Sequence, residues 1–204
     1  MEQGRLEFWF EFASTYSYPA AMRIEEAAGA AGVPLKWRPF LLGPIFASQG
    51  WGDSPFNLYP AKGRYMWRDM QRICEKYRLP FRRPGKFPRS GLLAARVALA
   101  AEAEPWCPRF VRAVYRANFA EDRDISRLET VAEILASVGQ NPREMVARAE
   151  SSENKQRLRE QTGWAAALGI FGAPTFIIGN ELFWGNDRLE DALEFYRRTI
   201  SPIA

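Results

Sequence analysis

Histidine is absent from this 204-residue chain. Its absence excludes histidine-based catalytic triads, histidine-ligated metals and the usual general base near neutral pH. Any chemistry must therefore use hydroxyls, carboxylates, lysine, tyrosine, backbone amides, or a reactive group that a cofactor brings.

Cysteine is scarce as well, with only Cys74 and Cys107 and no CxxC motif. This argues against a disulfide framework, a zinc site and a dithiol that cycles between redox states. Cys74 lies in "MWRDMQRICEKY", where apolar residues repeat at helical spacing, so we interpret it as a core thiol. Cys107 lies between two prolines in "PWCP" and has no second thiol nearby in the sequence.

Long apolar runs are missing too. No stretch approaches the roughly 18 residues of a membrane span, and the polar segment Met1–Glu7 lacks the apolar core of a secretory signal. We therefore expect a cytoplasmic protein with no membrane partner. The net charge is +4, but charges of both signs are spread along the chain, which favours a solvated basic surface or an anionic small-molecule substrate over a nucleic-acid partner.

With 47% apolar residues, the chain can bury the core of one domain, or of one domain with an insertion. Its two ends carry the strand patterns. A strand over 5–13, a helix over 18–32 and a strand over 33–40 predict a parallel βαβ unit. Near the C-terminus we expect a helix over 154–170, two strands over 171–185 joined by the hairpin pair Gly179–Asn180, and a last helix that begins with an Asp187–Glu190 capping box.

The middle of the chain has a different texture. From about Leu41 to Gly63 the glycines and prolines predict a loop. Apolar spacing beyond it predicts helices over 62–77, 90–103, 108–120, 126–138 and 142–149. The element order is therefore β-α-β, a helical block, and then α-β-β-α.

This order, with a hydroxyl cluster after the first strand and "GAPTF" before the third, resembles a thioredoxin-like fold. The segments "EFASTYSYPA", "PAKGRYM", "GIFGAPTFIIG" and "FWGNDRLE" resemble the 2-hydroxychromene-2-carboxylate isomerases and the kappa-class glutathione transferases, over essentially the whole chain. The resemblance implies an α/β thioredoxin-like fold (β-α-β…α-β-β-α) with an all-helical insertion. Residues 1–40 and 155–204 would form the thioredoxin-like domain, and residues 41–154 the insertion.

The family pattern S-P-[FY]-S-[FYW] places the active-site serine at Ser14, where thioredoxin relatives keep a cysteine. Thr15 replaces the family's proline, and Pro19 shifts the expected helix start towards residues 16–18. A hydroxyl that donates to a sulfur beside a helix N-terminus would lower the pKa of that thiol by about one to three pH units. The alternative, that Ser14 and Ser17 only cap the helix, stays open.

The resemblance also implies glutathione as the cofactor and a set of residues that bind it. Ala173, before a cis-proline at Pro174, would pair through its backbone with the cysteinyl unit. Asn186 and Asp187 would hold the γ-glutamyl end, although capping is an equally good explanation of Asp187. Lys62 would face the glycyl carboxylate. Asp53 stands where the family often has an asparagine.

For the second substrate the resemblance implies an aromatic carboxylate. Trp51 and Phe56 would line a slot for its ring. Four arginines are candidates to bind its carboxylate, and the sequence does not choose among them: Arg82, Arg83, Arg89 and Arg188. The resemblance implies a glutathione-dependent isomerase of aromatic catabolism. The alternatives are a kappa-type transferase or peroxidase and a non-catalytic thioredoxin-fold binding protein. Relatives are commonly homodimers, but no interface is legible in this sequence.

Overall fold

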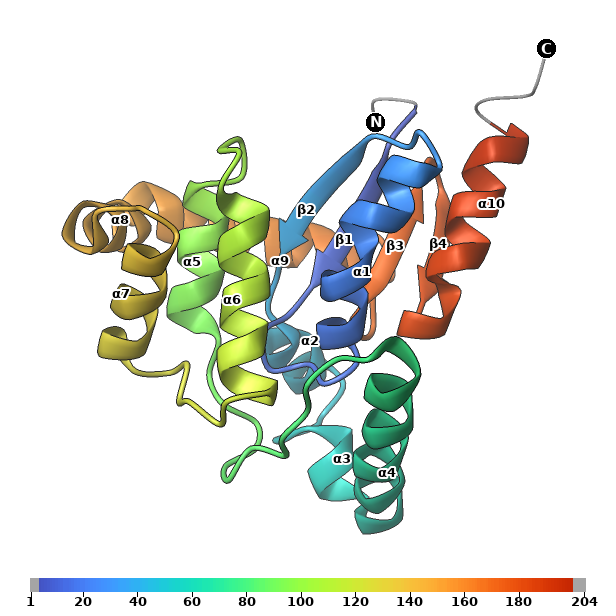
Figure 1. Cartoon of the computed structure of the whole chain (residues 1–204), viewed down its shortest axis with the longest axis horizontal. Coiled ribbons are helices and arrows are strands. Elements are labelled where there is room, and N and C mark those ends of the chain that lie inside the picture. Colours follow the sequence, from blue (N-terminus) through green and yellow to red (C-terminus); the bar gives the residue numbers. More distant parts are fainter. Residues whose placement is uncertain (1–3, 200–204) are drawn as a thin grey trace.

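A computed structural model describes residues 4–199, which contain a four-stranded sheet in the order β2-β1-β3-β4 (Figure 1). Strand β1 (Leu6–Phe10) pairs parallel with β2 (Leu35–Pro39) and antiparallel with β3 (Thr175–Ile178). Strand β4 (Glu181–Trp184) completes the sheet through an antiparallel pairing with β3. The predicted βαβ unit and the predicted hairpin are therefore confirmed.

Successive side chains of β1 point to opposite faces of the sheet and enter two separate core clusters. Phe8 and Phe10 belong to the large cluster, which includes residues of α1 (Ser17–Ala30) and α10 (Leu189–Thr199). Trp9 points to the other face, into a small cluster to which Ala165 of α9 (Ser152–Ala167) belongs. The helices therefore cover both faces of the sheet.

Seven helices lie between β2 and α9 along the chain (Figure 1): α2 (Leu42–Ser48), α3 (Pro55–Leu58), α4 (Pro60–Tyr77), α5 (Leu92–Ala100), α6 (Cys107–Phe119), α7 (Leu128–Ser137) and α8 (Pro142–Ala149). The five predicted helices of this block are confirmed, with small differences at their ends. The division of the chain into two domains stays a prediction.

Two predictions from local patterns are wrong. Residues 42–48 form helix α2 instead of loop, because Leu42 and Ile45 bury one face in the small core cluster, and residues 55–58 form the short α3. The capping box before the last helix does not form. Gly185 precedes a 3₁₀ turn and has no side chain that could cap it. The Asp187 carboxylate pairs with the Arg188 guanidinium at 3.4 Å instead of bonding to the helix end.

Helix α6 fixes the chain just beyond β1. The Tyr115 hydroxyl donates to the backbone oxygen of Glu11 at 2.9 Å, and the Asn118 side-chain amide donates to that of Phe12 at 3.2 Å. All four side chains are buried, so these bonds are shielded from water. The loop between β1 and α1 is thereby held in one position. Within residues 4–199, no helix combines the length and apolarity needed to cross a membrane.

Candidate active site

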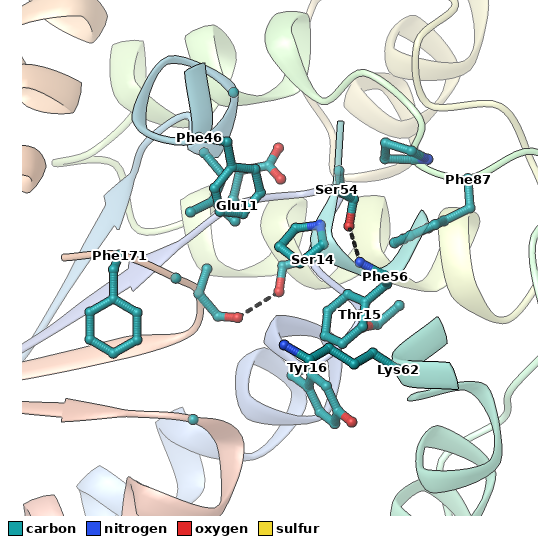
Figure 2. Close-up of a pocket in the computed structure, with 18 of the residues that line it drawn as sticks. Glu11, Ser14, Thr15, Tyr16, Phe46, Ser54, Phe56, Lys62, Phe87 and Phe171 are labelled. Atoms are coloured by element: carbon teal, nitrogen blue, oxygen red, sulfur yellow. Dashed lines mark hydrogen bonds between the residues drawn. The ribbon is translucent and has the colours of Figure 1, made fainter. Parts of the chain in front are cut away.

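A cavity of about 1520 Å³ opens where the β1–α1 loop meets the segments before β3 and after β4, and residues of α2, α3 and α4 also line it (Figure 2). Five of the six predicted site residues line it: Ser14, Lys62, Ala173, Asn186 and Asp187. Pro174 is not among the lining residues, but its peptide bond to Ala173 is cis, as predicted. The tertiary structure thus gathers the predicted residues from four segments of the chain.

Ser14 lies just before helix α1, which begins at Ser17 as the position of Pro19 predicts. The Ser14 hydroxyl accepts a hydrogen bond from the Ser17 backbone N–H at 3.3 Å and donates one to the backbone oxygen of Ala173 at 2.8 Å (Figure 2). The same hydroxyl therefore supports the helix end and faces the cis-proline segment. Capping and a role in the cavity are compatible.

The segment before β3 is packed closely against β4. A side-chain carbon on Gly172 would lie 2.4 Å from Nε1 of Trp184, so only glycine fits at this position. The Thr175 hydroxyl donates to the Gly172 oxygen at 2.9 Å, and the Gly185 N–H donates to the Pro174 oxygen at 3.0 Å. These contacts hold the Ala173 backbone in place opposite Ser14.

The remaining predicted residues place opposite charges around the cavity. Lys62 lies in the first turn of α4, with its amine 4.9 Å from the centre of the Tyr59 ring. Asn186 is buried, and its side-chain oxygen accepts from Arg23 at 3.1 Å. Asp187 lies next to Asn186 in the 3₁₀ turn. A zwitterionic ligand with a carboxylate and an ammonium group suits this distribution.

Aromatic side chains supply much of the cavity wall. Trp51 and Phe56, predicted to form a slot for a planar ring, both line it. Phe46 lies 5.6 Å from Trp51, and Tyr16 lies 6.1 Å from Phe56, measured between ring centres. The Tyr16 hydroxyl donates to the Asp69 carboxylate at 3.1 Å, a contact that the sequence did not reveal. Burial, reinforced by that carboxylate, raises the pKa of Tyr16, so the phenol stays protonated.

The four candidate arginines separate into two pairs. Arg89 and Arg188 line the cavity. Arg82 and Arg83 are not among the described lining residues, and Arg83 stacks over Trp67 with 5.0 Å between guanidinium and ring centre. The Arg89 guanidinium is bound by the Asp122 carboxylate and by the Arg123 backbone oxygen at 3.0 Å.

Glu11 is a lining residue that the sequence analysis missed. Burial raises the pKa of Glu11 to about 7, although a hydrogen bond from the Ala13 backbone opposes the rise. The sequence feature that could have identified Glu11 is an acidic residue directly after the apolar strand β1. Glu11 lies two positions beyond Trp9, and the alternation of side chains along a strand places both on the same face.

The cysteines do not take part in this site. Cys74 and Cys107 are both buried and unpaired, and burial raises the pKa of each thiol to about 12. Neither supplies a thiolate at neutral pH, which agrees with the interpretation of Cys74 as a core residue. Across residues 4–199, the structure contains no cluster of three or more side chains suited to a metal ion.

The family model of the DsbA-like thioredoxin domain matches residues 5–197. The 2-hydroxychromene-2-carboxylate isomerase of Sphingobium xenophagum is 30% identical over 195 residues, which cover 94% of this chain and 96% of that protein. Kappa 2 glutathione S-transferase of Caenorhabditis elegans is 25% identical over 204 residues, with 93% and 90% covered. A solved structure of 2-hydroxychromene-2-carboxylate isomerase superposes with a TM-score of 0.84 at 24% identity, over 98% of both chains.

The chain belongs to the DsbA-like thioredoxin family, within the group of the 2-hydroxychromene-2-carboxylate isomerases and kappa-class glutathione transferases. The fold is accordingly the α/β thioredoxin-like fold predicted from the sequence, with helices inserted between β2 and α9.

Proposed function

We propose that this protein is a cytoplasmic, glutathione-dependent isomerase that converts 2-hydroxychromene-2-carboxylate to trans-o-hydroxybenzylidenepyruvate in naphthalene-like aromatic catabolism. The observation that carries the proposal is the Ser14 hydroxyl, which lies at the start of α1 and bonds the Ala173 oxygen within a large cavity. The names of the relatives from Sphingobium xenophagum and Caenorhabditis elegans support the reaction and the cofactor.

The cavity residues fit glutathione. Lys62 would face the glycyl carboxylate, and Asp187 with Asn186 would face the γ-glutamyl end. The Ala173 backbone would pair with the cysteinyl unit, as an added strand does. Bound glutathione supplies a thiolate that adds reversibly to the conjugated double bond of the ring-opened substrate, so that the bond can rotate.

Ser14 would hold that sulfur in its anionic form. In the structure, the hydroxyl proton is directed at the Ala173 oxygen. A ligand amide that donates to the same oxygen would release the hydroxyl, which can then donate to the sulfur. A hydrogen bond to a charged group contributes about 1.5–3 kcal/mol and a helix N-terminus about 0.3–1 kcal/mol. Together these lower the pKa of the thiol by about one to three pH units, so no histidine is required.

The remaining cavity would hold the aromatic substrate. Trp51, Phe56 and Phe46 provide ring surfaces, and Arg89 and Arg188 are the two candidate arginines within reach of the cavity. Arg188 is the more exposed of the two, with its guanidinium paired to Asp191 at 2.7 Å, while the guanidinium of Arg89 is buried.

The test is the Ser14→Ala variant, with Ser137→Ala as the matched control. Ser137 also donates its hydroxyl to a backbone oxygen, but it lies on α7, away from the cavity. The ultraviolet absorbance of the thiolate, titrated against pH with glutathione bound, should show a pKa raised by one to three pH units only in Ser14→Ala. An undiminished isomerisation rate in Ser14→Ala would contradict the assignment.

A kappa-type transferase is the second candidate, favoured by the match to the Caenorhabditis elegans protein. Product analysis separates the two, because an isomerase consumes no glutathione and a transferase does. A non-catalytic binding protein remains the third alternative. It would show no affinity for glutathione in isothermal titration but would bind unfolded chains. The homodimer stays a prediction from the resemblance.

A further inference from the structure

A second titratable group lines the same cavity and takes no part in the hydrogen bonds of the Ser14 hydroxyl. Glu11 directly follows β1, is only 8% exposed, and lines the cavity. Its carboxyl lies close to Gly91, just before α5. A carboxyl in this position is neither on the protein surface nor sealed in the core.

Figure 2 shows Ser14 between two groups of side chains, with Glu11 and Phe46 on one side and Tyr16 and Lys62 on the other. Lys62 belongs to the part of the cavity that we assign to glutathione. Beside Glu11 lie the apolar ring of Phe46 from α2 and the Gly91 backbone before α5. Glu11 therefore lies on the side of Ser14 away from Lys62, where Phe46 offers a ring surface to an aromatic substrate.

The groups around Glu11 leave its carboxyl without a cationic partner. Tyr115 of α6 bonds only the backbone oxygen of Glu11. Gly91, just before α5, packs closely against this segment, since an added side-chain carbon there would lie 2.6 Å from Cβ of Phe12 and 3.3 Å from Oε1 of Glu11. Arg89 from the same segment is bound by Asp122, and among the described residues the structure shows no ion pair of Glu11.

Desolvation without a cation keeps a carboxyl protonated to higher pH. In this cavity it raises the pKa of Glu11 to about 7. The arrangement at Ser14 acts in the opposite direction on a bound thiol, by favouring its anion. The site thus shifts the two pKa values in opposite directions, which favours a protonated carboxyl beside an ionised thiol, the arrangement that an acid and a nucleophile need.

We propose that Glu11 is the catalytic acid and base of this cavity, giving a proton to the carbonyl oxygen of an unsaturated ketoacid and taking it back in the same turnover. This rests on the proposed function. As a sulfur–carbon bond forms at the far end of the conjugated system, the double-bond electrons move to the carbonyl oxygen, which takes the proton from Glu11. When the sulfur–carbon bond breaks, the double bond re-forms and the proton returns to the carboxylate.

The proposal predicts a bell-shaped dependence of kcat/KM on pH. The rising limb would follow the ionisation of the bound thiol, and the falling limb would follow the loss of the Glu11 proton. The neighbouring Tyr115 does not account for the falling limb, because burial raises its pKa well above its ordinary value.

The experiment compares the wild type with Glu11→Gln and Glu11→Met, and uses Glu181→Gln as the control. Glu181 is an exposed carboxylate of β4 outside the cavity lining. Glutamine keeps a hydrogen-bond donor but transfers no proton, and methionine removes both. Three quantities are measured: kcat/KM against pH with 2-hydroxychromene-2-carboxylate, the thiolate absorbance of bound glutathione, and the infrared carbonyl band of the protonated carboxyl in the ligand-free protein.

We expect Glu11→Gln to lower kcat/KM by about 10²–10⁴-fold, to abolish the falling limb, and to leave the thiolate absorbance unchanged. Glu11→Met should be at least as slow. The infrared band that titrates near neutral pH should disappear in both variants. A wild-type rate and falling limb in Glu11→Gln would overturn the proposal, as would loss of the thiolate together with the rate. A wild type that forms no thiolate with glutathione would instead contradict the proposed function.

Discussion

The replacement Glu11→Gln should change how the stability of the folded protein depends on pH. Burial raises the pKa of Glu11 from 4.5 to about 7 in the folded state, whereas the unfolded chain releases the proton near 4.5. The folded state therefore binds the proton more tightly, and the free energy of unfolding falls as pH rises from about 4.5 to about 7. Above about pH 7 this contribution is constant.

The size of the effect follows from the same two values. At about 1.36 kcal/mol per pH unit, the ionised carboxyl costs the folded state about 3 kcal/mol. Glutamine has nearly the same shape and no charge to bury. Relative to the wild type, Glu11→Gln should therefore gain about 3 kcal/mol of stability between about pH 4.5 and about pH 8, and most of this gain should appear between about pH 5 and about pH 7.

The assay is urea unfolding followed by tryptophan fluorescence at a series of pH values. The quantity of interest is the difference between variant and wild type, because other carboxylates, such as Asp122 and Glu150, contribute equally to both proteins and cancel. Glu181→Gln serves as the control, and its difference from the wild type should not vary with pH in this range. If the Glu11→Gln difference is equally flat, Glu11 is not a buried protonated acid.

Three further predictions test the core and the cavity. Cys74 and Cys107 should resist aromatic disulfide reagents in the native protein and react once it is unfolded in urea, because burial raises the pKa of both thiols to about 12. A rapid reaction of either thiol in the native protein would refute this. Lys62→Met should weaken glutathione binding about three- to fivefold in calorimetry while Lys86→Met does not, because an exposed ion pair contributes about 1 kcal/mol or less. Phe8→Ala should lower the free energy of unfolding by about 3–5 kcal/mol, because this side chain is fully buried and stacks on Phe176 with ring centres 5.6 Å apart. A loss below about 1 kcal/mol would show that the surrounding core side chains fill the cavity left by the ring.

Local sequence patterns were enough for the sheet and most of the helices. The aromatic run of β1, the alternation of β2 and the Gly-Asn pair before β4 each predict a strand. The partners of these strands follow simple rules, because β3 and β4 are neighbours in the sequence and β1 and β2 are joined by a right-handed crossover. The same patterns failed at α2, where glycine and proline indicate a loop. The burial of Leu42 and Ile45 under the sheet outweighs that local preference, and a pattern of residues carries no information about such distant contacts.

The sequence by itself excluded histidine chemistry, placed a hydroxyl at the first strand-to-helix turn and pointed to the family. Only the tertiary structure decided that the Ser14 hydroxyl bonds to Ala173, which lies 159 positions further along the chain, and that burial in the wall of the same cavity raises the pKa of Glu11. The reason is physical. A hydrogen-bond partner and a pKa are set by the atoms within a few ångströms of a group, and folding brings these together from remote parts of the chain.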